Sequence, residues 1–179
     1  MSYSVAQNTS FLTLASILQK IVSFVYFTIV ARIIGVGNTG SYFFAITFTT
    51  IFTVVADFGL GPILTREAAK FTDRAGDYMN TVLASKILFG IATYFLVVFF
   101  TVILKYPLEL RNLILLSGVT MFFDNLQSSF FSIFRAQKNL IYESVAIVIS
   151  QILTLAIGTT ALLLHGSLIW LIAAYTIPS

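Results

Sequence analysis

The sequence predicts an all-α fold, a polytopic transmembrane helix bundle, and three observations support that prediction. Hydrophobic residues make up 58% of the 179 residues and charged residues only 9%, whereas a soluble domain carries about 25% charged residues. Apolar stretches of about 20 residues or more recur along the chain, the length that a helix needs to cross a hydrocarbon core. These stretches lack the period-two alternation of membrane β-strands. We therefore expect a single transmembrane domain over residues 1–179.

Five complete apolar stretches and the beginning of a sixth are predicted as membrane spans. They cover residues 11–34, 41–64, 80–104, 112–134, 144–164 and 167–179. The N-terminus lacks the basic region of a signal peptide, so we expect the first stretch to be retained as a span. The sixth stretch is too short to cross a bilayer, so we expect the chain to be part of a longer protein.

The cations in the predicted loops set the expected orientation. Five of them follow the second and fourth spans, and three lie on the opposite face. The first group is Arg66, Lys70, Arg74, Arg135 and Lys138, and the second is Arg32, Lys105 and Arg111. This bias places the N-terminus and the loops 66–77 and 135–142 in the cytoplasm. Arg32 and Arg66 are expected to mark opposite membrane faces.

Four charged residues lie deep inside predicted spans, where an unpaired charge costs at least ~2.5 kcal/mol. Asp57 and Lys86 both lie roughly 10 Å from the cytoplasmic ends of their spans, at ~1.5 Å per helical residue. Lys20 and Asp124 both lie roughly 14 Å deep on the same arithmetic. Matched depth makes each couple a candidate ion pair, which would be either purely structural or part of a transport site.

Each span also carries a stripe of small or polar residues at helical spacing, and helix packing accounts for most of these stripes. Gly59, Gly61 and Pro62 follow Asp57 at the end of the second span. Because proline removes a backbone donor and glycine loosens a helix, they predict a kink or break there. Broken helices line transport sites in many membrane proteins. A simple helix end would account for the same residues.

Enzyme chemistry has few residues to use in this chain. His165 is the single histidine and there is no cysteine, so we expect no histidine-based triad, disulfide or metal cluster. HExxH and P-loop motifs do not occur, and the longest predicted loop, 65–79, is too short for a catalytic domain. We therefore expect no enzyme, no catalytic residue, no cofactor and no metal. The net charge of +3 is attributed to loop cations, without a nucleic-acid partner.

Several short motifs follow one another along the chain. They are Ala31-Arg32-Ile33-Ile34-Gly35, Gly40-Ser41-Tyr42, Asp57-Phe58-Gly59-Leu60, Arg66-Glu67-Ala68-Ala69 and the segment 130–138 after the fourth span. In this order they resemble the N-terminal part of the polysaccharide flippases, the Wzx or O-antigen and teichoic-acid exporter family. That family belongs to the multidrug/oligosaccharidyl-lipid/polysaccharide superfamily. The resemblance covers essentially this whole chain but only the first half of such a protein.

The resemblance implies the N-terminal lobe of a MATE-like flippase fold in the cytoplasmic (inner) membrane. The implied function is movement of a polyprenyl-diphosphate-linked oligosaccharide to the outer leaflet for surface polysaccharide biosynthesis. The implied partners are this lipid-linked oligosaccharide, membrane lipid and a C-terminal lobe. Cations would bind phosphate, lysine as a point charge and arginine as a fork, while carboxylates and amides would bind sugar or tune the cations. The expected substrate-binding residues are Lys20, Arg32, Asp57, Arg66, Lys86, Asp124, Asn125 and Gln127.

Two other functions remain open on the sequence. In a drug/cation antiporter of the same superfamily, Asp57 or Asp124 would bind H⁺ or Na⁺, but two lysines within the spans favour an anionic cargo. In a helical membrane subunit without transport of its own, the polar stripes would only join helices. A second lobe after Ser179 would support transport, and a true end there would favour the subunit.

Overall fold

A computed structural model describes residues 5–165 and 168–177, nearly all of which are helical. The elements are α1 (Val5–Asp57), α2 (Leu60–Lys70), the 3-10 helix η1 (Thr72–Arg74), α3 (Ala75–Ile103), α4 (Leu108–Ala136), α5 (Leu140–His165) and α6 (Leu168–Thr176). No strand occurs in these two ranges, so the predicted all-α class is confirmed. The expected start of the last span at residue 167 lies outside the described residues.

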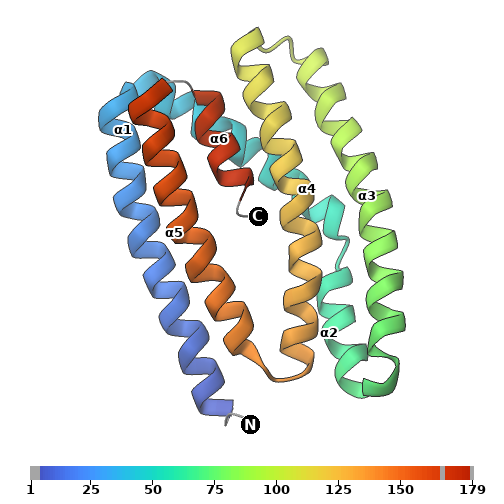
Figure 1. Cartoon of the computed structure of the whole chain (residues 1–179). Helices are drawn as coiled ribbons and strands as arrows, with labels where there is room; N and C mark the ends of the chain where they lie inside the picture. Colours follow the sequence, from blue (N-terminus) through green and yellow to red (C-terminus); the bar gives the residue numbers. More distant parts are fainter. Residues whose placement is uncertain (1–4, 166–167, 178–179) are drawn as a thin grey trace.

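Helix α1 contains both the first and the second predicted spans within 53 residues. A straight helix of that length would measure roughly 80 Å, but the chain bends at Gly35, whose φ of 77° and ψ of 169° are not helical. Glycine reaches positive φ without the steric penalty of a Cβ. The chain is helical again directly after Gly35, so residues 36–40, which lie between the first two predicted spans, belong to the helix. In Figure 1, α1 rises in blue, turns near its upper end and continues behind α6 and α4 toward α2.

The predicted break after the second span is confirmed. Helix α1 ends at Asp57, and α2 begins at Leu60. Between them, Phe58 and Gly59 have positive φ values of 47° and 78°. This left-handed pair redirects the chain, so that α2 leaves the line of α1 and packs against α3 and α4.

The long loop expected over residues 65–79 is wrong. Helix α2 continues to Lys70, and α3 already begins at Ala75 after the short η1. The residues concerned are good helix formers, mainly Arg, Glu, Ala and Lys. In addition, Leu64 and Ala68 bury one face of α2 in a small apolar cluster with α3 and α4, which stabilises the helix by tertiary packing.

The helices form two long antiparallel pairs, α1 with α5 and α3 with α4 (Figure 1). Helix α4 is central, since it contacts α1, α2, α3, α5 and α6. The larger apolar core joins residues such as Tyr42 and Ala45 of α1 to Leu113 and Ile114 of α4 and Ile172 of α6.

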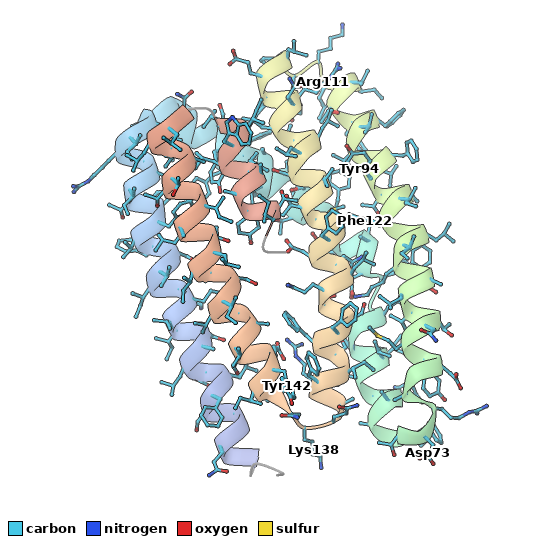
Figure 2. The ribbon with its side chains drawn as sticks, viewed as in Figure 1. Asp73, Tyr94, Arg111, Phe122, Lys138 and Tyr142 are labelled. Carbon is cyan, nitrogen blue, oxygen red and sulfur yellow. The ribbon has the colours of Figure 1, made fainter. Side chains whose placement is uncertain are left out.

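Two glycines bring α3 and α4 close together. A methyl group at Gly90 of α3 would lie 2.7 Å from the Phe122 ring, and one at Gly118 of α4 would lie 3.0 Å from the Tyr94 ring. Each aromatic ring thus occupies the space that a side chain would otherwise fill. Tyr94 and Phe122 lie along this helix pair in Figure 2. Small residues of this kind are typical of transmembrane helix interfaces.

Three helical segments are long and apolar enough to cross a membrane: Thr9–Asp57, Thr72–Ile103 and Leu140–Leu164. The first contains two predicted spans, one on each side of the bend. Helix α4, which contains the predicted fourth span, is as long as α3 but is not among the three. Its polar residues are buried against other helices, so it does not need an apolar surface on every side. The apolar helices and the bundle identify a membrane protein.

The loops divide between two ends of the bundle. Asp73, Lys138 and Tyr142 lie at one end, where α1 also begins, and Arg111 lies at the opposite end (Figures 1 and 2). This is the grouping that the count of loop cations predicted. The assignment of the first end to the cytoplasm stays a prediction.

Candidate functional site

Lys86 of α3 is the central residue of the site. Its side chain is completely buried, and Nζ lies 2.7 Å from Oδ1 of Asp57. Nζ also donates a hydrogen bond to Oγ of Ser128 at 2.7 Å and to the backbone oxygen of Asn125 at 3.1 Å. Three acceptors match the three N–H groups of a lysine. The predicted Asp57–Lys86 ion pair is confirmed, and its buried ammonium is fully hydrogen-bonded.

The helix break places Asp57 at this position. Because α1 ends at Asp57 and α2 turns away, the carboxylate faces the cleft between α2 and α4. Gly61 lies beside it, and a methyl group there would be in ordinary van der Waals contact with Asp57 Oδ1 and Ser132 Oγ, at 3.5 Å from each. Thr65 then ties α2 to α4 by donating a hydrogen bond to the backbone oxygen of Ser132 at 3.2 Å.

An open pocket of about 850 Å³ lies next to the ion pair, between the end of α1, α2 and α4. Four of the eight expected substrate-binding residues line it: Asp57, Arg66, Asp124 and Asn125. Lys86 does not line the pocket itself, but its Nζ contacts Asp57, which does. The structure thus brings together five of the expected residues from four different helices.

Two arginines line the pocket, and each is paired with a glutamate. Arg66 Nη2 lies 2.9 Å from Glu67 Oε1, and the Arg66 side chain is 75% exposed. Arg135 Nε donates to Glu143 Oε2 at 2.9 Å while Nη2 donates to Oε1. The Glu143 side chain is only 2% exposed. The hydrogen bonds to Glu143 raise the pKa of Arg135 above its ordinary value, so this guanidinium remains charged.

The cations at the pocket are therefore already paired. Lys86, Arg66 and Arg135 each contact a carboxylate, and Asp124 also lines the pocket. An anionic ligand would have to exchange places with a carboxylate at one of these cations. A cation or a neutral polar ligand would need no such exchange.

The side chain of Asn125 is the most unusual polar group of the pocket. It is 2% exposed, yet neither Oδ1 nor Nδ2 has a hydrogen-bond partner. The great majority of buried polar groups in folded proteins do have one. Because Asn125 lines the pocket, its amide is available to donate to, or accept from, a bound molecule.

Gln127 lies on the other side of α4 and lines a second pocket of about 220 Å³ together with Asp124, Gln19 and Gln151. Asp124 thus faces both pockets. The second pocket offers amides and a carboxylate, which suit hydroxyl groups. Within the described residues, no group of three or more His, Cys, Asp or Glu side chains could hold a metal ion.

Lys20 and Arg32 are exposed on α1, and neither lines the 850 Å³ pocket. The candidate pair of Lys20 with Asp124 is not formed in the described part of the chain. Gln19 lines a pocket with Asp124 instead, because consecutive residues of a helix point about 100° apart. Matched depth along two helices does not specify how each helix is rotated about its own axis, and therefore which side chain faces the neighbouring helix.

Arg135, Ser128 and Glu143 are residues of the site that the sequence did not indicate. Arg135 was interpreted only as a loop cation that sets topology. Ser128 stands one helical turn after Asn125, in a polar stripe that was attributed to helix packing. Ser128 could have been found from this spacing, because residues three apart share a helix face. Glu143 gave no signal, since its pairing depends on how the chain turns between α4 and α5.

The fold and the site define a helical membrane protein with a charged internal pocket. A family model described as polysaccharide biosynthesis protein matches residues 5–179 of the chain. The chain therefore belongs to this family, and its role lies in the synthesis or export of polysaccharide. Neither a curated protein nor a solved structure matches it.

Proposed function

We propose that the protein is a flippase, and that this chain forms the N-terminal lobe of it. Its cargo would be a polyprenyl-diphosphate-linked oligosaccharide, moved from the cytoplasmic to the outer leaflet of the cytoplasmic membrane. The supporting observation is the 850 Å³ pocket with charged and amide walls beside a broken helix, in a member of a polysaccharide biosynthesis family. Non-helical backbone at membrane depth is tolerated where it lines such a cavity. Lipid tails would stay in the bilayer.

The pairing of each cation with a carboxylate determines how a diphosphate would bind. A phosphate would replace a glutamate at an arginine, because a guanidinium forms two parallel hydrogen bonds with either anion. Arg66 is the more accessible choice, since its pair with Glu67 is exposed. Asn125 would contact a sugar hydroxyl. Lys20 and Arg32, exposed on α1, would meet the cargo from the side of the second lobe.

The decisive experiment uses Asn125, because its side chain makes no hydrogen bond that the fold would lose. In vesicles reconstituted with the full-length protein, Asn125→Ala should slow flipping of lipid-linked oligosaccharide by about tenfold, the effect of roughly 1.4 kcal/mol. Its unfolding temperature in detergent should equal that of the wild type. Ser129→Ala is the matched control, since Ser129 Oγ is also buried without a partner on α4 but does not line the pocket. A normal rate for Asn125→Ala would contradict the proposal.

The same assay tests Lys20. Lys20→Ala should abolish flipping at normal expression, and Lys20→Arg should keep part of the activity because the charge is retained. The exposed position of Lys20 makes a folding defect an unsuitable explanation for a loss. Flipping of Lys20→Ala at the wild-type rate would remove this residue from the cargo path.

The two carboxylates that line the pocket favour one second candidate function, a drug/cation antiporter. These carboxylates, Asp57 and Asp124, would bind H⁺ or Na⁺. A cationic drug that is expelled from loaded vesicles, with no flipping of lipid-linked oligosaccharide, would favour this alternative. Absence of both activities in the full-length protein would favour a structural membrane subunit.

The proposed direction of transport requires the α1 start and the loops 66–77 and 135–142 to be cytoplasmic. The chain has no cysteine, so single engineered cysteines report on the topology without background. In intact cells, Asp73→Cys should resist an impermeant thiol reagent, and Arg111→Cys at the opposite end should react. Labelling of Asp73→Cys from outside would reverse the orientation.

A further inference from the structure

An aromatic hollow lies at the bend of α1, between α1, α5 and α6. Its volume of about 370 Å³ is within the ~300–1,000 Å³ range of small-molecule sites. Residues from both sides of the bend at Gly35 line it. The aromatic ones are Phe24, Tyr26, Phe27, Tyr42, Phe43 and Tyr175. The rings of Phe27 and Phe43 meet edge to face across the bend, with centroids 5.1 Å apart. The bend therefore places both arms of α1 around the hollow.

This hollow is the last of three neighbouring spaces that differ in chemistry. The 850 Å³ pocket and the 220 Å³ pocket share Asp124 and Phe131. The 220 Å³ pocket and the aromatic hollow share Gln151, Thr154 and Tyr175. Arginines and carboxylates line the first space, amides, hydroxyls and one carboxylate line the second, and no described residue that lines the third is charged. The series fits a ligand with a charged end and a neutral remainder.

Polar groups in its walls distinguish the aromatic hollow from a site for a lipid chain. Ser23 of α1 and Gln151 and Thr154 of α5 line it. Thr154 Oγ1 donates its proton to the backbone oxygen of Ser150 at 2.9 Å, so toward a ligand it can only accept. The amide of Gln151 can both donate and accept. An apolar chain would take these groups out of water without a hydrogen bond, which costs free energy, whereas a hydroxyl-bearing ligand would bond to them.

The inner wall of the hollow is rigidly held, and its rim is not. Tyr26 is 7% exposed, and its hydroxyl lies against Gly158 of α5, where a larger residue would not fit. Tyr42 is 3% exposed, and its ring packs edge to face on Phe43 at 5.2 Å. Walls that are already ordered reduce the entropy cost of binding. Phe24, in contrast, is 71% exposed, so it can be replaced without loss of core packing.

We propose that the aromatic hollow binds one sugar ring of the cargo, a subsite that rests on the proposed function. A sugar ring has faces of C–H groups and a rim of hydroxyls. The C–H groups carry partial positive charge and pack on the negative face of an aromatic ring, while the hydroxyls bond to Gln151 and Thr154. The sugar would be one away from the diphosphate, because no described residue lines both this hollow and the pocket with the two arginines.

Thermal unfolding of the purified full-length protein in detergent tests the subsite without transport. The two probes are a short-chain polyprenyl diphosphate without sugar and the same lipid carrying an oligosaccharide. A ligand that binds only the folded state stabilises it by RT ln(1 + [L]/Kd), so the rise in unfolding temperature reports each affinity. The wild type should bind the oligosaccharide probe several-fold more tightly. Phe24→Leu and Gln151→Leu should each remove most of this difference and leave the affinity for the sugar-free probe unchanged.

Phe95→Leu is the matched control, because Phe95 is also exposed, at 67%, but belongs to α3 and does not line the hollow. It should bind both probes as the wild type does. Leucine keeps an apolar surface at residue 24, so a bound lipid chain would tolerate Phe24→Leu and a stacked sugar would not.

Three results would overturn the subsite. They are equal affinity of the wild type for the two probes, unchanged affinities in both Phe24→Leu and Gln151→Leu, and tighter binding of both probes by Gln151→Leu. The last would assign the hollow to a lipid chain. Sugar-dependent binding that both variants lose, in a protein that does not flip the lipid in vesicles, would contradict only the proposed function. Flipping by a wild type that binds the two probes equally would contradict only the subsite, and binding of neither probe would contradict both.

Discussion

The two halves of α4 are both buried, but different interactions hold them. Near the Arg111 end, Leu113 and Ile114 join the large apolar core, and Gly118 receives the ring of Tyr94. In the other half, Ser128 and the backbone of Asn125 bind the ammonium of Lys86. Close packing of side chains stabilises the first half, and hydrogen bonds to the buried Lys86 ammonium stabilise the second.

This difference explains why the site lies where it does. Between membrane helices the hydrophobic effect is weak, so close packing of rings against small residues joins the first half. Such packing does not depend on a polar network. The second half depends on a polar network, which is stable only when each member is satisfied. Among the described residues, its unsatisfied side chains are the Asn125 amide and the Ser129 hydroxyl. Of these two, Asn125 lines the large pocket, so its amide is the place where a ligand would complete the network.

The largest effect is expected from breaking the charge pair of the polar half. Asp57→Ala leaves the fully buried Lys86 without its counter-ion, and removing one partner of a buried pair costs about 3–5 kcal/mol. Lys86→Met should cost less, because the Asp57 side chain is 28% exposed and keeps contact with water in the pocket. The amount of folded protein and its unfolding temperature in detergent measure both effects.

The double substitution Asp57→Ala with Lys86→Met is the control for this prediction. It removes both charges, so part of the lost stability should return, as happens when buried pairs are replaced by apolar residues. A double variant as unstable as Asp57→Ala alone would mean that the two residues do not act as a pair.

Depth along a helix could be predicted from the sequence, but rotation about the helix could not. The rise per residue fixes how deep Asp57 and Lys86 lie, and a tight connection between their helices makes them meet. The same arithmetic failed for Lys20 and Asp124, because packing of α1 turned Gln19 toward α4 instead. Rotation is set by the neighbours of a helix, which the sequence of that helix does not specify.

Backbone changes of direction were predicted where the residue type demands them. The run after Asp57 combines two glycines and a proline, and the break is there. The extent of the connections was less predictable, because α2 continues to Lys70 only through the burial of Leu64 and Ala68 against other helices. The Arg135–Glu143 pair likewise depends on the turn between two helices. Local signals therefore located the site, and tertiary packing completed it.

A smaller effect is expected where close packing joins α3 to α4. Gly90→Ala would bring a methyl group within 2.7 Å of the Phe122 ring, so the ring or the helix must move, and overpacking of this kind costs about 1–3 kcal/mol. Gly37→Ala is the control, since Gly37 is helical with open space around it and alanine favours a helix. The unfolding temperature should fall for Gly90→Ala and hold or rise for Gly37→Ala. Equal shifts in both would show that close packing does not join these two helices.

The smallest effect is expected at the exposed pair of Arg66 with Glu67. Its 2.9 Å separation is close to the 2.7 Å of the buried pair, but exposed pairs contribute only about 0–1 kcal/mol because water and salt screen them. Glu67→Gln should therefore leave the unfolding temperature nearly unchanged at low and high salt. It should also release Arg66 for phosphate, so flipping should be maintained or faster. A loss of stability as large as that of Asp57→Ala would mean that distance, and not burial, determines what an ion pair contributes in this protein.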